Sequence, residues 1–432
     1  MGVRNTSPGS TRWSHGTVAE LFSGRDNSLG LLRLLLATAV VVAHARILGF
    51  GIREYGHTFT HGQTDLGKIS VFGFFILSGL LITRSGNRLP IGRFLWNRAL
   101  RLLPGLWVCL CVTALVVAPF LFWRQHHTLE NFWNRPDGPF EFLQANWWVR
   151  THQPGISGIM ETAQGKWMAF DPGINGALWS LQYEVLCYLG VGLLVLAGAR
   201  AGGLTQARRA VLVIAVLLGG YVLTNSLDNH FMDAFSLQIH AERIVSPIVG
   251  GFIVKWAFFL GYAFAIGSLI EVYKDRIPVS TPLAVLSALV TLATLRYGFF
   301  FAVGIPAFAY LLVWLAIRLP KPFRAVGRKN DYSYGIYIYG FVVEQALSAL
   351  GGARWGFPAY LALALGGTLA LAMLSWHLVE RPALKLKDAR FPRLTPRGPR
   401  GPQAGGEPQA GGEPQSRPAA EPDLAAAGTA AR

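Results

Sequence analysis

The chain has 432 residues, of which 52% are hydrophobic and only 14% are charged. Because a soluble globular domain carries roughly 25% charged residues, this composition excludes an ordinary soluble protein and predicts helices that lie in lipid. The formal net charge is +16. The positive residues lie in short loops between apolar blocks, and no nucleic-acid-binding signature accompanies them, so we expect no nucleic-acid partner.

The predicted elements follow in chain order. Residues 1–28 form a polar segment without an apolar stretch before a cleavage site, and we expect it to be retained on the cytoplasmic side. Within residues 29–388, apolar blocks predict an all-α membrane bundle of about ten transmembrane helices. The predicted spans are 29–49, 67–84, 98–122, 176–198, 208–227, 248–272, 279–296, 298–318, 332–351 and 355–379. Residues 389–432 are rich in Pro, Gly and Ala and are predicted to form a disordered cytoplasmic tail.

Lys and Arg residues set the predicted orientation, because they concentrate in short cytoplasmic loops. The loops after the second, fourth and eighth spans carry such residues, for example Arg84, Arg200 and Lys321. These loops share one side if the number of spans is even, so both termini are predicted to be cytoplasmic. The large loop over 123–175 then faces outside. Its tryptophans and histidines suit stacking on a sugar, and they equally suit anchoring at the membrane interface.

The first span contains two ionisable residues, Arg33 and His44. At this spacing they share one helix face, about 20° apart around the axis and roughly 16 Å apart along it. Ionisable groups inside a span usually face the bundle interior or a water-filled cavity. A histidine there suits a general base, because a free histidine titrates near neutral pH. A helix–helix hydrogen bond explains His44 as well, and Arg33 could extend to the interface.

The third span begins with a pair of arginines. Arg98 and Arg101 lie at i,i+3 spacing, so two guanidinium groups share a face that suits phosphate binding. Positive-inside topology accounts for the same pair.

The fourth span carries Glu184 about two turns from its start. A buried carboxylate must be paired, hydrogen-bonded or protonated, so Glu184 could accept from His44, orient an acceptor hydroxyl or pair with an interior arginine. Other polar or aromatic residues suit the lining of a cavity or an acceptor site, although packing explains each of them too. They are Ser78, Trp179, Ser180, Tyr337 and Glu344.

These signals form an ordered set of motifs. The set comprises Arg33 followed by ten residues and His44, the segment FFILSGLLIT, Arg98-xx-Arg101-xx-Pro104, LWSLQYE ending at Glu184, SYGIYIY at 333–339 and LVERP at 378–382. Over residues 29–388, the set closely resembles the integral-membrane acyltransferase 3 family. The resemblance implies O-acylation of cell-envelope or exported glycans, with cytoplasmic acyl-CoA as the donor and acetyl as a common acyl group.

The resemblance also implies roles for individual residues. His44 corresponds by motif to the catalytic histidine of the family, and Arg33, Arg98 and Arg101 correspond to arginines linked to donor binding. Many members have a histidine in the YLxH pattern of the penultimate helix, where this chain has Gly340. That departure argues against a mechanism that needs a second membrane histidine.

The predicted function is transfer of an acyl group, most simply acetyl, from acyl-CoA to a hydroxyl of a sugar-containing acceptor in the bacterial cytoplasmic membrane. His44 would act as general base, with Glu184 as a second catalytic group, or would form an acyl-histidine intermediate. Acyl-CoA is a co-substrate. No bound cofactor or metal is expected, because the histidines lack HxxxH or HExxH spacing. A multi-pass transporter of a glycan or small molecule is the competing class.

Overall fold

The computed structural model describes residues 16–22, 24, 26–150, 152–159, 173–201, 204–228, 243–246 and 250–388. The prediction for the tail over 389–432 and that for residues 1–15 lie outside the described residues, as does part of the predicted outer loop.

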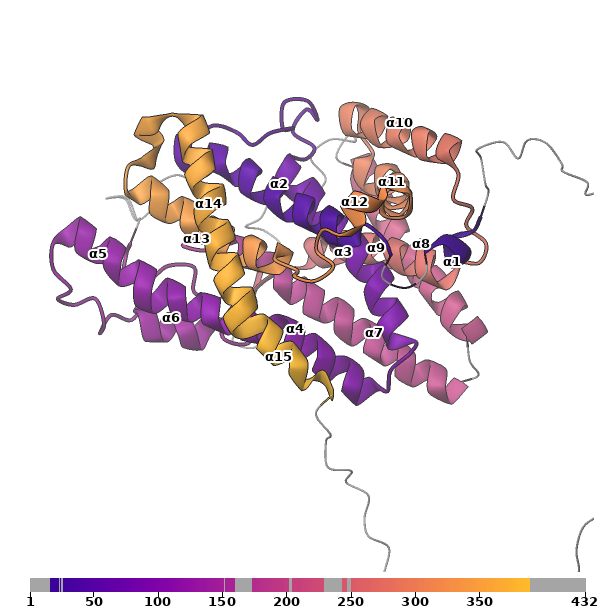
Figure 1. Cartoon of the computed structure of the whole chain (residues 1–432), viewed down its shortest axis with the longest axis horizontal. Coiled ribbons are helices and arrows are strands. Elements are labelled where there is room, and N and C mark those ends of the chain that lie inside the picture. The colour runs from indigo at the N-terminus through magenta and orange to yellow at the C-terminus, as the bar shows by residue number, and fades with distance from the viewer. Residues whose placement is uncertain are drawn as a thin grey trace, which may run out of the picture. The chain divides into compact units, whose positions relative to one another are not determined.

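Long helices follow one another with short connections (Figure 1). They are α2 (Leu29–Phe50), α3 (Leu66–Gly86), α4 (Ile91–Val112), α5 (Ala118–His126), α7 (Leu181–Ala201), α8 (Leu204–Asp228), α9 (Val254–Val272), α10 (Thr281–Tyr297), α11 (Ile305–Arg318), α13 (Ser333–Ala349) and α14 (Phe357–Ser375). The short helices are α1 (Val18–Leu21), α6 (Pro139–Asn146), α12 (Lys321–Arg324) and α15 (Arg381–Lys385). Single π-turns at Thr113–Val117 and Trp376–Glu380 join α4 to α5 and α14 to α15, and a third at Phe300–Gly304 precedes α11.

Eight helices in the described part of the chain are long and apolar enough to cross a membrane. The chain is therefore a multi-pass membrane protein, and the all-α prediction is confirmed at that level. The predicted spans 279–296 and 332–351 correspond to α10 and α13, which have 17 residues each. Both are somewhat shorter than the roughly 20 residues that a straight crossing needs.

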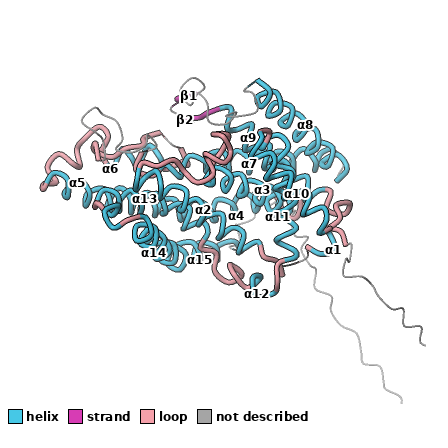
Figure 2. The backbone as a smooth tube through the Cα atoms, turned by 90° about the horizontal axis from the view of Figure 1, so that it is seen from above, coloured by secondary structure: helices cyan, strands magenta, loops and turns pink. Residues whose placement is uncertain are grey.

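The start of the predicted span 248–272 was wrong. Strand β1 (Arg243–Ser246) pairs antiparallel with β2 (Gly250–Ile253), and α9 begins only after this hairpin, which Figure 2 shows in magenta. The hydroxyl of Tyr183 on α7 donates to the Ile253 carbonyl at 3.2 Å and accepts from the Ile253 amide at 2.9 Å. A side chain thus satisfies backbone groups that a helix would have satisfied internally, and this favours the extended conformation there.

Contacts between helix ends define two opposite rims of the bundle. On the first, here called the arginine rim, Arg33 near the start of α2 pairs with Asp331 just before α13. On the opposite rim, the Ser348 hydroxyl near the end of α13 donates to the Leu48 carbonyl near the end of α2. Helices α2 and α13 therefore run parallel and side by side. The ion pair between Arg84 at the end of α3 and Glu271 at the end of α9 carries further charge at the arginine rim.

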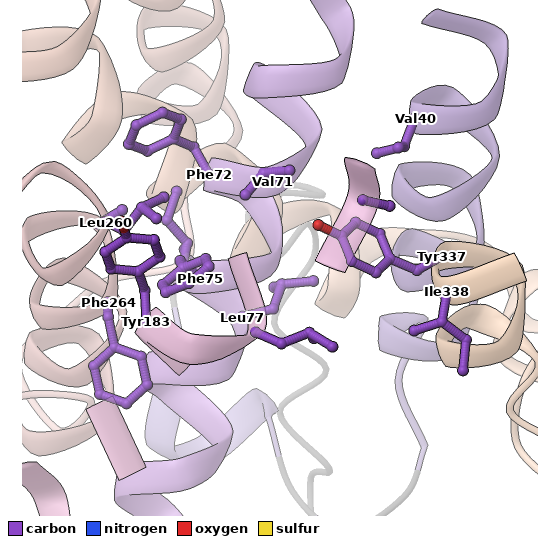
Figure 3. Close-up of a cluster of buried hydrophobic side chains, with 14 of the residues drawn as sticks. Val40, Val71, Phe72, Phe75, Leu77, Tyr183, Leu260, Phe264, Tyr337 and Ile338 are labelled. Carbon is purple, nitrogen blue, oxygen red and sulfur yellow. The ribbon is translucent and has the colours of Figure 1, made fainter. Parts of the chain in front are cut away.

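Helix α3 packs directly against α9 through two glycines. A Cβ atom at Gly79 would lie 2.0 Å from the Phe264 carbonyl oxygen, and one at Gly267 would lie 2.0 Å from the Ile76 oxygen. The backbones therefore touch, as the small residues in the second span predicted. Figure 3 shows part of the resulting core, with Phe264 of α9 on one side of α3 and Tyr337 of α13 on the other.

Candidate active site

A cavity of about 250 Å³ opens between α2, α3, α4, α7 and α13. Seven of the ten residues predicted for the site line it. They are Arg33, Ser78, Arg98, Arg101, Ser180, Glu184 and Tyr337. Phe74, Phe75 and Leu81 supply apolar walls between these polar groups. The sequence motifs from five helices therefore converge on one cavity.

Two of the arginines share one carboxylate. The guanidinium groups of Arg33 and Arg101 each lie 2.7 Å from the same oxygen of Asp331. Arg101 also lies 3.4 Å from the carboxylate of Glu380. The other Asp331 oxygen accepts from the Ser333 hydroxyl at 2.5 Å, so this aspartate is fully occupied. The start of α13 is thereby tied to both α2 and α4.

The charges in this network nearly cancel. Burial alone would raise the pKa of Asp331, but the adjacent Arg33 and Arg101 outweigh it and hold that pKa well below its ordinary value. Asp331 is therefore ionised and neutralises part of their charge. Arg98 lines the same cavity without an ion pair to any carboxylate in the described residues, and its Nε atom is buried without a hydrogen-bond partner. Among the three predicted donor-binding arginines, Arg98 is the one available to a new anion.

Glu184 belongs to the cavity rather than to His44. Its carboxylate accepts from the Tyr188 hydroxyl at 2.5 Å and from the Ser78 hydroxyl at 3.3 Å. Nearby, the hydroxyls of Ser180 and Tyr337 lie 2.6 Å apart. The suggested hydrogen bond from His44 to Glu184 does not form, because the carboxylate is taken up by its neighbours on α7 and α3.

The partner of His44 is Glu54, a residue that sequence reasoning missed. Nδ1 of His44 lies 2.8 Å from Oε1 of Glu54. Helix α2 ends at Phe50, and Gly51 caps it in the left-handed conformation with φ 65°, so the chain turns back toward His44. The signal in the sequence was an acidic residue shortly after a glycine at the helix end.

The charge state of Glu54 fixes the tautomer of its partner. Burial raises the pKa of Glu54, but the hydrogen bond and charge of His44 outweigh this and lower it to about 2. Asp65 and Lys68, which form an ion pair at 2.7 Å at the start of α3, also act on Glu54. Because Glu54 is ionised, the imidazole must donate from Nδ1. Its Nε2 atom is then left with a free lone pair, as a general base requires.

Aromatic rings separate His44 from the cavity. Phe74 packs edge-on against Tyr337, with ring centroids 5.8 Å apart. One helical turn along α13, Phe341 packs edge-on against His44 at 5.2 Å. The cavity and the histidine thus lie at successive levels of the same helix.

The remaining predicted residues lie elsewhere. Trp179 does not line the cavity and stacks against Trp256 of α9, with ring centroids 4.2 Å apart. Glu344 is fully buried on α13. At Gly340 an added Cβ would lie 2.7 Å from Val41 of α2, so the close contact of the two helices leaves no room for a larger residue there.

The model of the acyltransferase domain family Acyl_transf_3 matches residues 26–377 of this chain. The chain belongs to the acyltransferase 3 family. The match covers every cavity-lining residue named above and both members of the His44–Glu54 pair. The expectation drawn from the ordered motifs is therefore confirmed, and the protein is a membrane acyltransferase.

Two relatives support this membership. An O-acetyl transferase of Shigella phage Sf6 is 28% identical, over 83% of this chain and 96% of the relative. Nodulation protein 10 of Rhizobium leguminosarum bv. viciae is 27% identical, over 88% of this chain and 98% of the relative. No solved structure matches this acyltransferase 3 chain.

Proposed function

We propose that the protein transfers an acetyl group from acyl-CoA to a hydroxyl of a sugar-containing acceptor, with His44 as general base. The observation that carries the proposal is the state of the imidazole, whose Nδ1 is held by ionised Glu54 so that Nε2 is free. This is the orientation that lets an imidazole take a hydroxyl proton. The O-acetyl transferase relative supports acetyl as the transferred group.

The donor enters from the arginine rim in this proposal, which makes that rim cytoplasmic. About ten passes, including the short α10 and α13, would then leave both termini on that side of a bacterial cytoplasmic membrane. Arg98 binds a donor phosphate first, because Arg33 and Arg101 already share Asp331. Release of either arginine from Asp331 would add a second phosphate contact.

The pantetheine arm then extends along α2. Arg33 and His44 are separated by roughly 16 Å along the helix axis, a span that an extended arm covers. The rings of Phe74, Tyr337 and Phe341 lie on this route, so they must shift for the thioester to reach Nε2.

The acceptor hydroxyl approaches His44 from the opposite rim. His44 removes its proton while the oxygen attacks the thioester carbonyl, and the carbon–sulfur bond breaks on collapse. The same imidazole returns the proton to the thiolate, so that an ester and free CoA are the products. Glu184, held by Ser78 and Tyr188, lines the donor cavity in this scheme and takes no part in proton transfer.

Reconstitution of the purified protein in lipid vesicles tests the proposal. We expect labelled acetyl-CoA on the arginine-rim side to yield a labelled ester on one member of a panel of envelope glycans, with free CoA thiol in equal amount. Movement of a glycan across the vesicle bilayer without ester formation would instead support a transporter.

A further inference from the structure

One buried carboxyl has no role in the scheme so far. Glu344 is 0% exposed, and neither of its carboxyl oxygens has a hydrogen-bond partner in the described part of the chain. No other carboxyl among the described residues has both oxygens in that condition. Since an unpaired buried polar group costs free energy, its presence in the bundle calls for an explanation.

The register of α2 and α13 sets the level of this carboxyl. Three contacts align the two parallel helices, namely Arg33 with Asp331, Val41 with Gly340 and Leu48 with Ser348. The numbering offset between partners is thus nearly constant, and it puts Glu344 at the level of His44. The ring contact between His44 and Phe341, three residues before Glu344, agrees with this register.

The surroundings of Glu344 favour its neutral form. The charged groups near it are Glu54, whose carboxylate acts on it electrostatically, and the His44 imidazole that Glu54 already holds. The Tyr360 hydroxyl from α14 donates to the backbone carbonyl of Glu344 at 2.8 Å, not to its side chain. An ionised carboxylate in this position would lack any compensating cation, and the cost would be several kcal/mol. The side chain therefore keeps its proton and has an unused O–H donor.

We propose that Glu344 is a neutral acid that donates a hydrogen bond to the thioester oxygen as negative charge develops on it beside His44. This inference rests on the proposed acyl transfer from acyl-CoA. As the hydroxyl oxygen bonds to the carbonyl carbon, the carbonyl electron pair moves to oxygen and accepts from Glu344. Collapse restores the carbonyl and expels the thiolate, which takes the proton from His44. Glu344 begins and ends protonated, so no further reactant is needed.

Two substitutions at this position separate hydrogen bonding from charge. Removal of one oxyanion donor typically lowers kcat by about 10²- to 10³-fold. We expect that loss in Glu344→Leu, with little change in the KM for acetyl-CoA. Glu344→Gln keeps an N–H donor and is expected to retain kcat within about tenfold. Thr368→Val on α14 is the matched control, because the Thr368 hydroxyl is also buried without a partner, and it should leave kcat unchanged.

Infrared difference spectroscopy supplies a readout that does not depend on turnover. The spectrum of the wild-type protein minus that of Glu344→Gln should contain the carbonyl band of a protonated carboxylic acid. A carboxylate band in its place would overturn the inference, whatever the activities of the variants.

The activity arms separate this inference from the proposed function. If His44→Ala abolishes transfer while Glu344→Leu keeps the full rate, the inference fails and the proposed function stands. If both variants keep the full rate, both fail. If Glu344→Gln loses as much activity as Glu344→Leu at equal protein level, Glu344 acts as an ionised group and the inference is wrong.

Discussion

His44 and Glu54 form a hydrogen-bonded pair at 2.8 Å across the end of one transmembrane helix. The glycine turn after α2 folds the acidic residue back onto the histidine that precedes it on the same helix. This short-range connection orients the imidazole without help from another helix. It also means that the orientation of the proposed base can be changed by one substitution outside the membrane-spanning segments.

Replacement of Glu54 by glutamine is predicted to lower the rate of acyl transfer by about 10²- to 10⁴-fold. The amide no longer stabilises a positively charged imidazole, and it permits the wrong tautomer of His44. The rate constant for acetyl transfer at saturating donor is the measurement. Glu141→Gln on α6, an exposed glutamate, is the control and should keep the wild-type rate. A normal rate in Glu54→Gln would contradict the assigned tautomer.

The same pair predicts a pH dependence of stability. Folding lowers the Glu54 pKa from 4.5 to about 2, so its contribution to stability is present above 4.5 and is lost as the pH falls toward 2. The difference in Tm between the wild type and Glu54→Gln, measured in detergent, should therefore be constant at neutral pH and shrink across that acid window. A difference that grows on acidification would show that Glu54 is not held in its ionised form.

Asp331 is predicted to be a strong determinant of stability. Its replacement by asparagine leaves Arg33 and Arg101 without their shared carboxylate, and breaking a buried ion pair typically costs about 3–5 kcal/mol. Because these side chains are 17–25% exposed, we expect about 1–3 kcal/mol. Asp26→Asn is the matched control, since Asp26 pairs with Arg324 but is 63% exposed, and should cost at most about 1 kcal/mol. Thermal unfolding in detergent compares the two, and equal losses would contradict the shared-carboxylate network.

Arg98 and Arg101 are predicted to act differently although they lie one helical turn apart. Arg98→Gln should raise the KM for acetyl-CoA about 10- to 100-fold with little loss of Tm, because a hydrogen bond to a charged group contributes about 1.5–3 kcal/mol. Arg101→Gln should lower Tm, because it leaves Asp331 and Glu380 with fewer partners. Arg93→Gln, on an exposed position of α4, controls for nonspecific loss of positive charge. A KM that is unchanged in Arg98→Gln would remove this residue from donor binding.

The contact between α3 and α9 is predicted to tolerate no added methyl group. Gly79→Ala would drive its Cβ into the Phe264 carbonyl, and overpacking of this kind typically costs about 1–3 kcal/mol or more. Gly190→Ala on α7 has no atom within 4 Å of the added Cβ and should be neutral or stabilising by up to about 1 kcal/mol. The yields of folded protein and the Tm values test the contrast. Equal behaviour of the two variants would contradict the backbone contact.

Much of the helical framework could be predicted because lipid demands long apolar segments, and these are visible in the sequence. The hairpin before α9 could not, because the hydroxyl of Tyr183 that satisfies its backbone comes from another helix. Motif order brought seven predicted residues to one cavity, yet their pairing was hidden. Asp331 is separated from Arg33 by most of the chain, and only helix packing shows that they meet.

The misassigned partner of His44 has a similar cause. Glu184 was favoured because a carboxylate inside a span is conspicuous, whereas Glu54 lies in a polar loop where acidic residues are ordinary. The direction in which the chain leaves α2 decides between them, and the left-handed turn at Gly51 sets that direction. The role proposed for Glu344 likewise depends on the register of two helices, which no local pattern specifies.

The most direct test of the account is the rate of acetyl transfer from labelled acetyl-CoA by His44→Ala, at matched protein level, in membranes that contain the acceptor glycan. The account predicts a loss of at least about 10²-fold, with donor binding at the Arg98 cavity retained. Transfer at the wild-type rate would contradict it, because no other imidazole in the described residues lies between the cavity and the opposite rim on α2.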